Sequence, residues 1–429
     1  MNDPQLLSWP GLTHGCPAQF MLERVHGIDS TPVWTFRDDL DTGRTKAMRH
    51  KNSVYHALLQ HVPWGAFDQL VDEHGGDKGV RTLTMRDQFS AMLYGQLAGA
   101  VSLREIECGL QSHRTRLYHL NARPVKRSTL ADANASRPVA VFAGLFSKLM
   151  KQAHRGLRRS LEETVYLIDS TSLRLNELSK KWARFATGVC GAKAHIIYDA
   201  GAGCPVYMAV TAANVNDITA AQAMPIEAGA SYVFDLGYYD YGWWAKLDAA
   251  GCRIVTRFKS NTPLCVIEDR PIAQDGAILS DRVGCLPGRQ ARNRQNPYRD
   301  PVREVRVRIE TGKILRILTN DLDASAGDIA ALYKRRWEIE LFFRWVKQNL
   351  KIKKFLGTSE NAIRIQIAIA LIAYLLLKLA HAGQKSGMTL LTFTRLVRSN
   401  LMHLKRIDRL LEDDSEMPPD DRQMAFLCL

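Results

Sequence analysis

The apolar residues of this chain change their spacing once, near residue 160, and that change limits the folds open to it. From residue 54 to about 158 they recur at helical spacing, whereas residues 165–168 form an unbroken apolar run typical of a buried strand. Similar strand patterns follow at residues 194–198, 205–211, 232–234 and 253–258. Residues 304–309 and 313–318 alternate about Thr311-Gly312, which predicts a hairpin. Helical patterns lie between these strands and after them. The sequence therefore predicts a helical region followed by an α/β region with a mixed sheet.

Two of the expected strands lead directly into an aspartate: Asp169 follows residues 165–168, and Asp235 follows residues 232–234. A carboxylate at such a place is partly removed from water, so it must be paired or must bind a metal ion. If the two strands are neighbours in one sheet, the two carboxylates lie close together. The pattern therefore indicates a functional site at this place in the sheet.

A third carboxylate, Glu340, lies on a helix that we expect from about residue 327 to 350. Residues 333–347 contain neither Pro nor Gly. At about 100° of rotation per residue, five polar side chains fall within an arc of roughly 80° beside an apolar arc: Tyr333, Arg336, Glu340, Arg344 and Lys347. Taken alone, this is the pattern of a half-buried helix on which Glu340 pairs with Arg336 or Arg344. If the helix packs across the two strands, three carboxylates converge, and an all-oxygen set suits Mg²⁺ or Mn²⁺.

The charge of the chain favours nucleic acid as a partner. Its 429 residues include 58 Lys and Arg against 44 Asp and Glu, a net charge of +14. Such an excess favours a polyanion, although a merely basic soluble protein has the same balance. Six basic residues in the helical region would suit phosphate contacts: Arg114, Arg116, Arg123, Lys126, Arg127 and Arg137.

A helix–turn–helix outline lies just before these basic residues. The helical pattern of residues 88–110 breaks at Gly99 and restarts at Ser102, which is spaced from Glu105 as in a capping box. DNA-reading modules share this outline with many plain helical hairpins. A second capped helix is expected to start near Ser128 and to continue past Leu149.

Cysteine usage and hydropathy predict a cytoplasmic protein with no membrane partner. The eight cysteines are scattered, with no close pair of the kind that builds a zinc site. Nothing resembling a secretory signal begins the chain, so reduced thiols are expected. The most apolar run, residues 367–377, is too short to span a bilayer and is flanked by polar and charged residues. We interpret it as a buried core helix.

The residues around the three acids resemble those of the DDE transposases of the insertion-sequence 4 family. Asp169 lies in Leu-Ile-Asp-Ser-Thr, Asp235 lies in Val-Phe-Asp-Leu-Gly-Tyr, and the third segment reads Tyr-Lys-Arg-Arg-Trp-Glu-Ile-Glu-Leu-Phe-Phe. Four residues also have the spacing of that family's Tyr-Arg-Glu-Lys signature: Tyr333, Arg336, Glu340 and Lys347. The resemblance extends from about residue 48 to residue 381.

The resemblance implies a domain order. A ribonuclease-H-like catalytic domain would occupy residues 159–381, with a β-rich insertion at residues 259–326. An α-helical DNA-binding region would precede it at residues 48–158. Residues 1–47 are expected to be a flexible arm or a mis-assigned start. Residues 382–429 are expected to be a helical segment, with a last helix at residues 390–411 and a loose tail from residue 413.

The resemblance also implies an activity. Enzymes of the family bind the terminal inverted repeats of their own element, dimerise across the paired ends, cut the double-stranded DNA and join its 3′ ends to target DNA. By this resemblance Asp169, Asp235 and Glu340 would hold catalytic Mg²⁺, for which Mn²⁺ could substitute. Tyr333, Arg336 and Lys347 would contact DNA phosphates near the cut. Arg344, on the same helical arc, would help to neutralise phosphate charge. The enzyme would work in a bacterial cytoplasm, associated with the nucleoid when bound to DNA.

Two other functions stay open on the sequence alone: an inactive DNA-binding relic or regulator, and a ribonuclease-H-like nuclease that cuts without strand transfer. The three intact acids weigh against the relic, and the long helical region argues for recognition of particular DNA ends. One feature departs from the family. Members that form a DNA hairpin are expected to place a Trp in the insertion to hold a flipped base. Residues 259–326 contain no Trp, and Tyr298 is their only aromatic ring, so the hairpin route is not favoured.

Other polar and aromatic residues near the three acids have plainer interpretations. We expect Glu338 to face solvent, and Lys193 and His195 to be structural or to touch DNA. Asp217 is expected to be a helix N-cap, with a place near the site as the lesser alternative. Trp243 and Trp244 are expected to pack in the core, with the role of the missing Trp as the alternative for either one.

Overall fold

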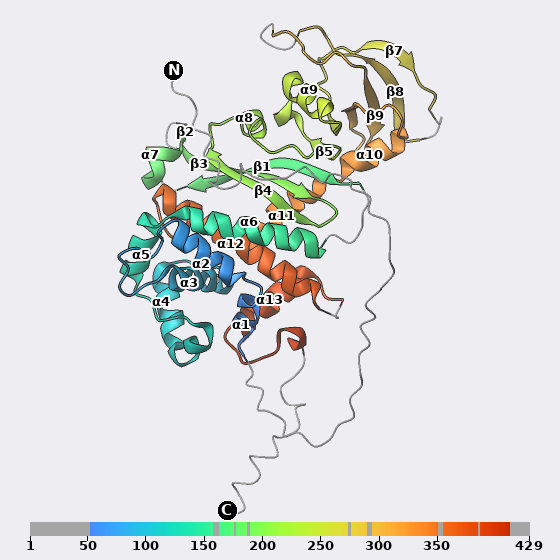
Figure 1. Ribbon diagram of the computed structural model, residues 1–429. Coiled ribbons are helices and arrows are strands. Elements are labelled where there is room, and N and C mark those ends of the chain that lie inside the picture. The colour runs from blue at the N-terminus through green and yellow to red at the C-terminus, as the bar shows by residue number, and fades with distance from the viewer. Residues whose placement is uncertain are drawn as a thin grey trace, which may run out of the picture.

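The structure is a computed structural model that describes residues 52–157, 163–175, 177–186, 189–272, 276–289, 294–350, 355–384 and 387–411. The arm expected at residues 1–47 and the tail expected from residue 413 lie outside the described residues. A helical layer and one large sheet lie against each other, with further helices beyond the sheet (Figure 1).

The helical region forms where the apolar spacing predicts it. Its elements are α1 (Val54–Leu59), α2 (Trp64–Glu73), α3 (Met85–Ala98), α4 (Leu103–Ser112), the 3₁₀ helix η1 (Arg114–Leu120), α5 (Arg127–Ser136) and α6 (Val139–Leu157). α3 ends at Gly99, whose φ of 77° is left-handed. Ser102 then caps α4 by accepting a hydrogen bond from the amide of Glu105. The predicted helix–turn–helix outline is therefore confirmed.

The single capped helix expected from Ser128 past Leu149 was wrong, because two helices stand in its place. Arg137 has an extended backbone, since the ring of Pro138 disfavours a helical conformation in the residue before it. The first helix, α5, also lacks the expected cap, because its N-cap residue Lys126 makes no capping hydrogen bond through its side chain. The chain therefore turns before Pro138, and α6 packs against the sheet.

One mixed sheet follows the helical region, as the strand patterns predict. Its strands are β1 (Val165–Leu175), β2 (Arg184–Ala186), β3 (Val189–Asp199), β4 (Cys204–Ala212), β5 (Ser231–Phe234), β6 (Arg253–Arg257), β7 (Cys265–Asp269), β8 (Ile278–Cys285), β9 (Val302–Arg308) and β10 (Ile314–Thr319). β1, β3 and β4 pair antiparallel in that order, whereas β5 pairs parallel with β1 and β6 pairs parallel with β5. The short elements η2 (Glu177–Ser179) and α7 (Lys180–Ala183) connect β1 to β2.

Residues 259–326 extend this sheet outward from β6. β10 pairs with β6, and β9, β8 and β7 follow in order toward the far edge (Figure 1). β9 and β10 form the hairpin that the sequence predicts, with Gly312 in its turn at a φ of 79°. The strands β7 and β8 were not predicted. All five residues of β7 are exposed, so this strand has no buried face that would make its apolar and polar residues alternate.

Each face of the sheet has its own hydrophobic core, since alternate side chains of a strand point to opposite faces. Val165 and Leu167 of β1 belong to the core under α6 and α12 (Glu360–Ala382). Tyr166 and Ile168 belong to the core under α8 (Asp217–Ala221), η3 (Leu236–Tyr238) and α9 (Tyr241–Ala249). Trp243 and Trp244 are buried in this second core, as expected.

The helix expected from residue 327 to 350 is interrupted, and that prediction was wrong. It forms α10 (Ala326–Lys334) and α11 (Trp337–Asn349). Between them the amide of Arg336 bonds to the carbonyl of Tyr333, and the amide of Glu338 bonds to the carbonyl of Arg335. These bonds reach three residues back instead of four, which tightens the chain. The rotation of about 100° per residue therefore does not continue across Arg335 and Arg336.

The long apolar helix α12 packs against α1, α3, α5, α6 and α13 (Leu390–Asn400). This confirms the predicted core helix. Among the described residues it is the one helix long and apolar enough to cross a membrane, yet 83% of its most apolar window is buried in the protein. The helix is longer than the apolar run because it takes in Arg364, Gln366 and Lys378, which were expected to flank it.

The last helix was expected to run to residue 411 and instead ends at Asn400, so this boundary was wrong. Beyond it, the carbonyls of Leu401 and His403 accept hydrogen bonds from the amides of Tyr55 and Val54. The first amides of a helix have no partner within the helix. The chain therefore leaves α13 to satisfy the start of α1, and the short helix η5 (Ile407–Arg409) follows.

Candidate active site

The sheet brings the first two acids to neighbouring strands. β1 and β5 are parallel, with Leu167 opposite Val233, so Asp169 and Asp235 each follow two positions later. Asp169 ends the apolar run but not the strand, because β1 stays paired with the long strand β3 as far as Leu175. The two acid-bearing strands are neighbours in the sheet, which is the condition for bringing the two carboxylates together.

The third acid reaches this place from α11, which packs against β1. The guanidinium of Arg336 lies between two carboxylates: its Nη1 is 3.6 Å from Oδ2 of Asp169, and its Nη2 is 2.5 Å from Oε1 of Glu340. All three side chains are half-buried. The pairing of Glu340 with Arg336 and the approach of Glu340 to Asp169 are therefore both present in one structure.

The electrostatics of Asp169 reflect this crowding. The pKa of Asp169 is raised to about 6. Burial is the largest cause and the nearby charges of Asp235 and Glu340 add to the rise, while the amide of Ser170 and the charge of Arg336 oppose it. The amide of Ser170 donates to Oδ1 of Asp169 at 2.7 Å. The carboxylate therefore carries a cost when it is ionised, which a bound cation would relieve.

The carboxylate of Asp235 is also oriented by backbone. Its Oδ1 accepts a hydrogen bond of 2.8 Å from the amide of Gly237, at the start of η3. Each aspartate is thus held by an amide within two residues of it.

Of the four other residues expected at the site, Tyr333 and Arg336 lie closest to the acids. Tyr333 is only 7% exposed, and its ring lies 5.9 Å from the guanidinium of Arg336. Burial raises the pKa of Tyr333, and the charge of Arg336 opposes that rise. Tyr333 therefore presents little surface and packs beside Arg336.

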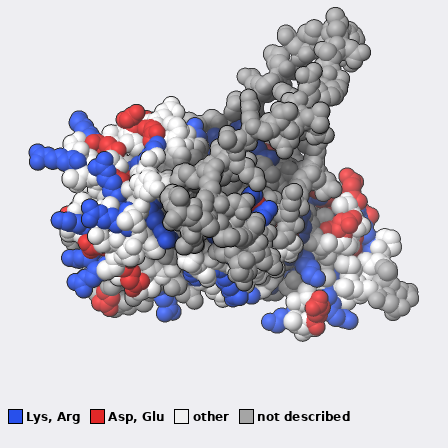
Figure 2. All heavy atoms as spheres, turned by 90° about the horizontal axis from the view of Figure 1, so that it is seen from below, with Lys and Arg blue, Asp and Glu red and all other residues white. Residues whose placement is uncertain are grey.

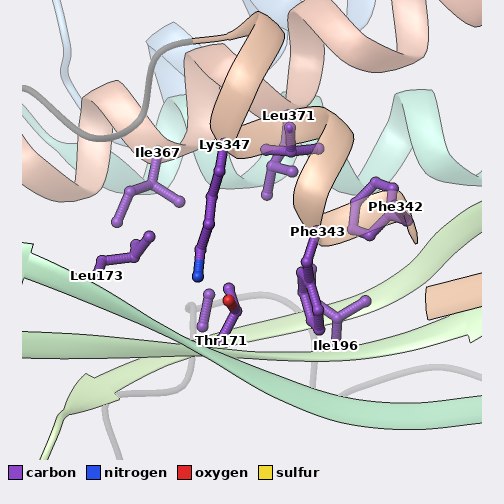
Figure 3. Close-up of a pocket in the computed structure, with 10 residues that line it drawn as sticks. Thr171, Leu173, Ile196, Phe342, Phe343, Lys347, Ile367 and Leu371 are labelled. Atoms are coloured by element: carbon purple, nitrogen blue, oxygen red, sulfur yellow. The ribbon is translucent and has the colours of Figure 1, made fainter. Parts of the chain in front are cut away.

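Lys347 lies further along the same helix and points from α11 toward Thr171 of β1 (Figure 3). It lines a small cavity of about 20 Å³ together with Leu173, Phe343 and other apolar side chains. A cavity of this size holds about one water molecule. Thr171 is two residues beyond Asp169, on the same face of β1, so Lys347 reaches the strand that carries the first acid.

Arg344 is exposed on the outer side of α11 and lies 5.6 Å from the ring of Trp337, which is itself 49% exposed. Glu338 pairs with Arg335 at 3.0 Å, away from the three acids. Arg344 is one helical turn beyond Glu340 on α11, whereas Glu338 lies on the opposite side of the helix.

Sequence reasoning missed a polar cluster on the opposite face of β1. Asp217 is the first residue of α8, and the N-cap is Asn216, so the expected N-cap role was wrong. The carboxylate of Asp217 accepts hydrogen bonds from Oγ of Ser170 at 2.7 Å and from Nζ of Lys193 at 3.2 Å. His195 is fully buried there and bonds to Thr211. The only sequence signal was that these polar residues lie on, or just after, expected strands.

The donor set suits a divalent metal ion by its chemistry. Asp169, Asp235 and Glu340 offer carboxylate oxygens, the ligands that Mg²⁺ and Mn²⁺ prefer, and two of them already face one cationic group, Arg336. The described residues hold no group of three His, Cys, Asp or Glu side chains close enough to bind a metal ion as they stand. The cysteines among the described residues are all free. The three carboxylates would therefore hold a metal ion by moving closer together around it.

The basic residues of the helical region differ in what they contact. Arg116 donates to the carbonyl of Met402 at 2.8 Å, and Arg137 donates to Oε1 of Gln88 at 3.2 Å, so these two join parts of the fold. The others are exposed on η1, on the loop after it and at the start of α5: Arg114, Arg123, Lys126 and Arg127.

Two family models match the chain. The transposase DDE domain matches residues 160–376, a span that contains the three acids. A domain of unknown function, DUF4372, matches residues 50–123 in the helical region.

Relatives with curated names support the first match. "Putative transposase y4zB" of Sinorhizobium fredii is 44% identical over 271 residues, which cover 62% of this chain and 75% of that protein. "Probable transposase for insertion sequence element IS5377" of Geobacillus stearothermophilus is 28% identical over 282 residues, covering 63% of this chain and 72% of that protein.

Among solved structures, the piggyBac transposase synaptic complex with hairpin DNA is similar with a TM-score of 0.43 and 12% identity, covering 89% of this chain and 90% of that one. A likeness at that level carries no conclusion about fold or function. The DDE model spans about half of the chain, and the Sinorhizobium relative is covered over three quarters of its length. The chain therefore belongs to the DDE transposases, metal-dependent enzymes that cut DNA.

Proposed function

We propose that this chain is an insertion-sequence transposase of the insertion-sequence 4 type. It would bind the terminal inverted repeats of its own element as a homodimer, cut the DNA at their ends and join the 3′ ends to target DNA. The observation that carries the proposal is the approach of Asp169 and Glu340, from β1 and α11, to the single guanidinium of Arg336, beside Asp235 at the end of β5.

The strand order supports a ribonuclease-H-like fold for the catalytic domain. Three antiparallel strands, β4, β3 and β1, are followed by β5 and β6, which run parallel to β1. This strand order places the acids side by side: Asp169 lies on the central strand β1, and Asp235 lies at the end of its parallel neighbour β5. The insertion at residues 259–326 adds four antiparallel strands beyond β6.

Asp169, Asp235 and Glu340 would hold Mg²⁺, or Mn²⁺ in its place. When bound, the metal would activate a water molecule or a 3′-hydroxyl and stabilise the leaving oxygen of the phosphodiester. Asp169 must be ionised for this role, and the amide of Ser170 keeps its Oδ1 oriented. The two neighbouring acids oppose that ionisation, so the site has high affinity for positive charge.

Arg336 would change partner during the reaction. It neutralises Asp169 and Glu340 in this structure, and it would turn to a DNA phosphate once a metal ion takes over that neutralisation. Guanidinium groups suit such contacts because their donors match two phosphate oxygens. Tyr333 would hold Arg336 by packing beside it, while Lys347 and Arg344 would contact phosphates along α11.

The helical region at residues 48–158 would recognise the DNA ends. The stretch from residue 108 to 131 contains five Lys and Arg residues and no Asp or Glu. Figure 2 views the molecule from below; Lys and Arg are frequent along its left edge, the side of α4 and α5 in Figure 1, with Asp and Glu among them. Clustered cations of this kind contact phosphates and fix a protein on a duplex.

The test is cleavage and joining of a plasmid that carries the two DNA segments flanking the gene, with Mg²⁺ present. We expect the wild-type protein to cut and join, and Glu340→Ala to bind the DNA without doing either. Glu338→Ala is the matched control, because it removes an acid two residues away on the same helix that pairs with Arg335 at 3.0 Å. It should retain activity.

The other outcomes separate the alternatives. Binding without cutting by the wild-type protein would favour an inactive DNA-binding relic, and cutting without joining would favour a nuclease. Full activity of Glu340→Ala would refute the proposed metal site.

A further inference from the structure

The side chain of Asp217 lies on the opposite face of β1 from the proposed metal site. It reaches residues that adjoin both Asp169 and Asp235. It starts α8, on the face of the sheet that belongs to the second core. Its Oδ1 accepts hydrogen bonds from Oγ of Ser170 at 2.7 Å and from Nζ of Lys193 at 3.2 Å. Lys193 is held in turn by the carbonyl of Val215 at 3.1 Å. This carboxylate is therefore fixed and neutralised by groups of the protein.

The first contact of Asp217 reaches Asp169 through Ser170. Ser170 follows Asp169 directly, and its amide donates to Oδ1 of Asp169 at 2.7 Å. The same residue donates its hydroxyl to Asp217 on the opposite face. The hydroxyl of Ser170 is therefore fixed on one face of β1, while its amide orients Asp169, whose side chain lies on the other face.

The second contact reaches Asp235 through Gly237. The amide of Gly237 donates to Oδ1 of Asp235 at 2.8 Å. A Cβ on Gly237 would lie 3.0 Å from Oδ1 of Asp235 and 3.2 Å from Oδ2 of Asp217. The two carboxylates therefore enclose this glycine, and Asp217 limits where its amide can sit.

Tyr238 fills the space between these groups. Its side chain is 1% exposed, and burial raises its pKa well above the ordinary value, with the charges of Asp217, Asp169 and Asp235 adding to that rise. The buried phenol therefore lies near all three carboxylates.

We propose that Asp217 is a positioning residue of the active site. With Lys193 it fixes Ser170 and Gly237, whose amides set the carboxylates of Asp169 and Asp235 for metal binding. This inference rests on the metal site proposed above. A plain helix-capping role does not explain the contacts, because Asn216 is the N-cap of a helix of only five residues.

Asp217 is assigned a positioning role and not that of a fourth metal ligand, because Lys193 and Ser170 both use its Oδ1. An amide side chain can accept the same two hydrogen bonds through its own oxygen. Asp217→Asn should therefore keep the positioning, whereas Asp217→Ala should lose it. For a metal ligand both variants should weaken metal binding, since a neutral amide is a poor substitute for a carboxylate that balances the charge of the metal.

The experiment measures Mn²⁺ binding to the full-length protein by electron paramagnetic resonance, with the metal alone as the probe. Mutating a residue that orients metal ligands typically weakens metal binding by about 10-fold to 100-fold. We therefore expect Asp217→Ala to weaken Mn²⁺ binding by at least about tenfold. Asp217→Asn should stay within about threefold of the wild-type affinity. Wild-type affinity in Asp217→Ala, or equal weakening in both variants, would overturn the proposal.

Asp321→Ala is the matched control. Asp321 is also a carboxylate held by a cation: it pairs with Arg253 at 2.8 Å, and its side chain is 9% exposed against 24% for Asp217, but it lies after β10. Its removal should lower stability and leave Mn²⁺ affinity unchanged. Weakened binding in this variant as well would mean that any loss of stability lowers metal affinity, which would refute a specific role for Asp217.

A second measurement does not depend on metal. Amide hydrogen exchange followed by mass spectrometry should rise in Asp217→Ala within the segments that contain Ser170 and Gly237, and should not rise there in Asp321→Ala. If the wild-type protein binds no Mn²⁺, the proposed metal site fails, and exchange still tests the positioning. Unchanged exchange at both segments would overturn it.

Discussion

Replacing Asp169 by Asn should make the metal-free protein more stable while it abolishes DNA cleavage. The pKa of Asp169 is raised by burial from 3.8 to about 6 in the folded protein. Each pKa unit corresponds to about 1.4 kcal/mol, so keeping this carboxylate ionised costs the folded state about 3 kcal/mol at pH 8. Asn has nearly the same shape, still accepts the bond from the amide of Ser170, and carries no charge.

The sign of the pH dependence follows from the direction of the shift. Between pH 3.8 and 6 the folded protein holds a proton on Asp169 that the unfolded chain has lost, so its contribution to stability falls as pH rises through this window. Above pH 6 the loss is complete. The advantage of Asp169→Asn should therefore be about 3 kcal/mol at pH 8 and about half of that at pH 5.

The assay is urea denaturation of both proteins at pH 5 and pH 8 with a chelator present. Asp321→Asn provides a control of opposite sign. Burial raises the pKa of Asp321, but the amides of Ala324 and Asp323 and the charge of Arg253 outweigh burial and lower it, so the ionised form stabilises the fold. This variant should be less stable than the wild type at pH 8. A gain in Asp169→Asn that is absent at pH 8, or equal at both pH values, would refute the reasoning.

Three further predictions concern single contacts. Gly237→Ala should cut DNA at least about tenfold more slowly with little change in melting temperature, because its Cβ would press on Asp235 at 3.0 Å; unaltered cleavage would contradict this. Asp199→Asn should lower stability at pH 7 by roughly 3 kcal/mol, because Asp199 is buried against His154 at 2.7 Å. Burial raises the pKa of Asp199, but His154 and nearby amides lower it below its usual value, so this stability should be lost as pH falls through the acid range; urea titrations across that range that show no such loss would count against the pairing. The guanidinium of Arg316 donates to the carbonyls of Lys259, Ser260 and Thr262, a set of bonds that an ammonium group cannot reproduce. Arg316→Lys should therefore speed proteolysis near these residues; an unchanged rate of proteolysis would contradict the role of these bonds.

The sequence predicted most of the sheet because buried strands leave a plain signal. Residues 165–168 and 232–234 are apolar runs, and their aspartates stand out against them. The strand β7 left no signal, since all its residues are exposed. Helix boundaries were predicted where a cap or turn residue marks them, as at Ser102 and Gly99.

The errors in the helices came from tertiary contacts that no local pattern records. The tightening at Arg335 and Arg336 occurs without Gly or Pro, and it places the guanidinium of Arg336 against Asp169. The end of α13 depends on α1, more than three hundred residues away in sequence, because Leu401 serves the first amides of that helix.

The role of Asp217 could not be read from sequence for a related reason. Its partner Lys193 faces it only because β3 pairs with β1 in one register, with Ser170 opposite His195 and Ser172 opposite Lys193. A shift of one residue would turn Lys193 to the other face of the sheet. Register across a long connection is set by the whole fold, so the pattern of single residues did not contain it.

The packing of α12 among the N-terminal helices has a consequence for how the protein is made. Residues 360–382 supply the centre of the core that α1, α3, α5 and α6 share. A chain growing from its N-terminus exposes the apolar faces of those helices until some two hundred further residues have been added, so early folding of this region as a separate unit is disfavoured. The helical region, which holds the exposed cations, and the sheet region, which holds the acids, are therefore expected to fold together. A chain terminated before α12 would leave the ribosome with neither part complete.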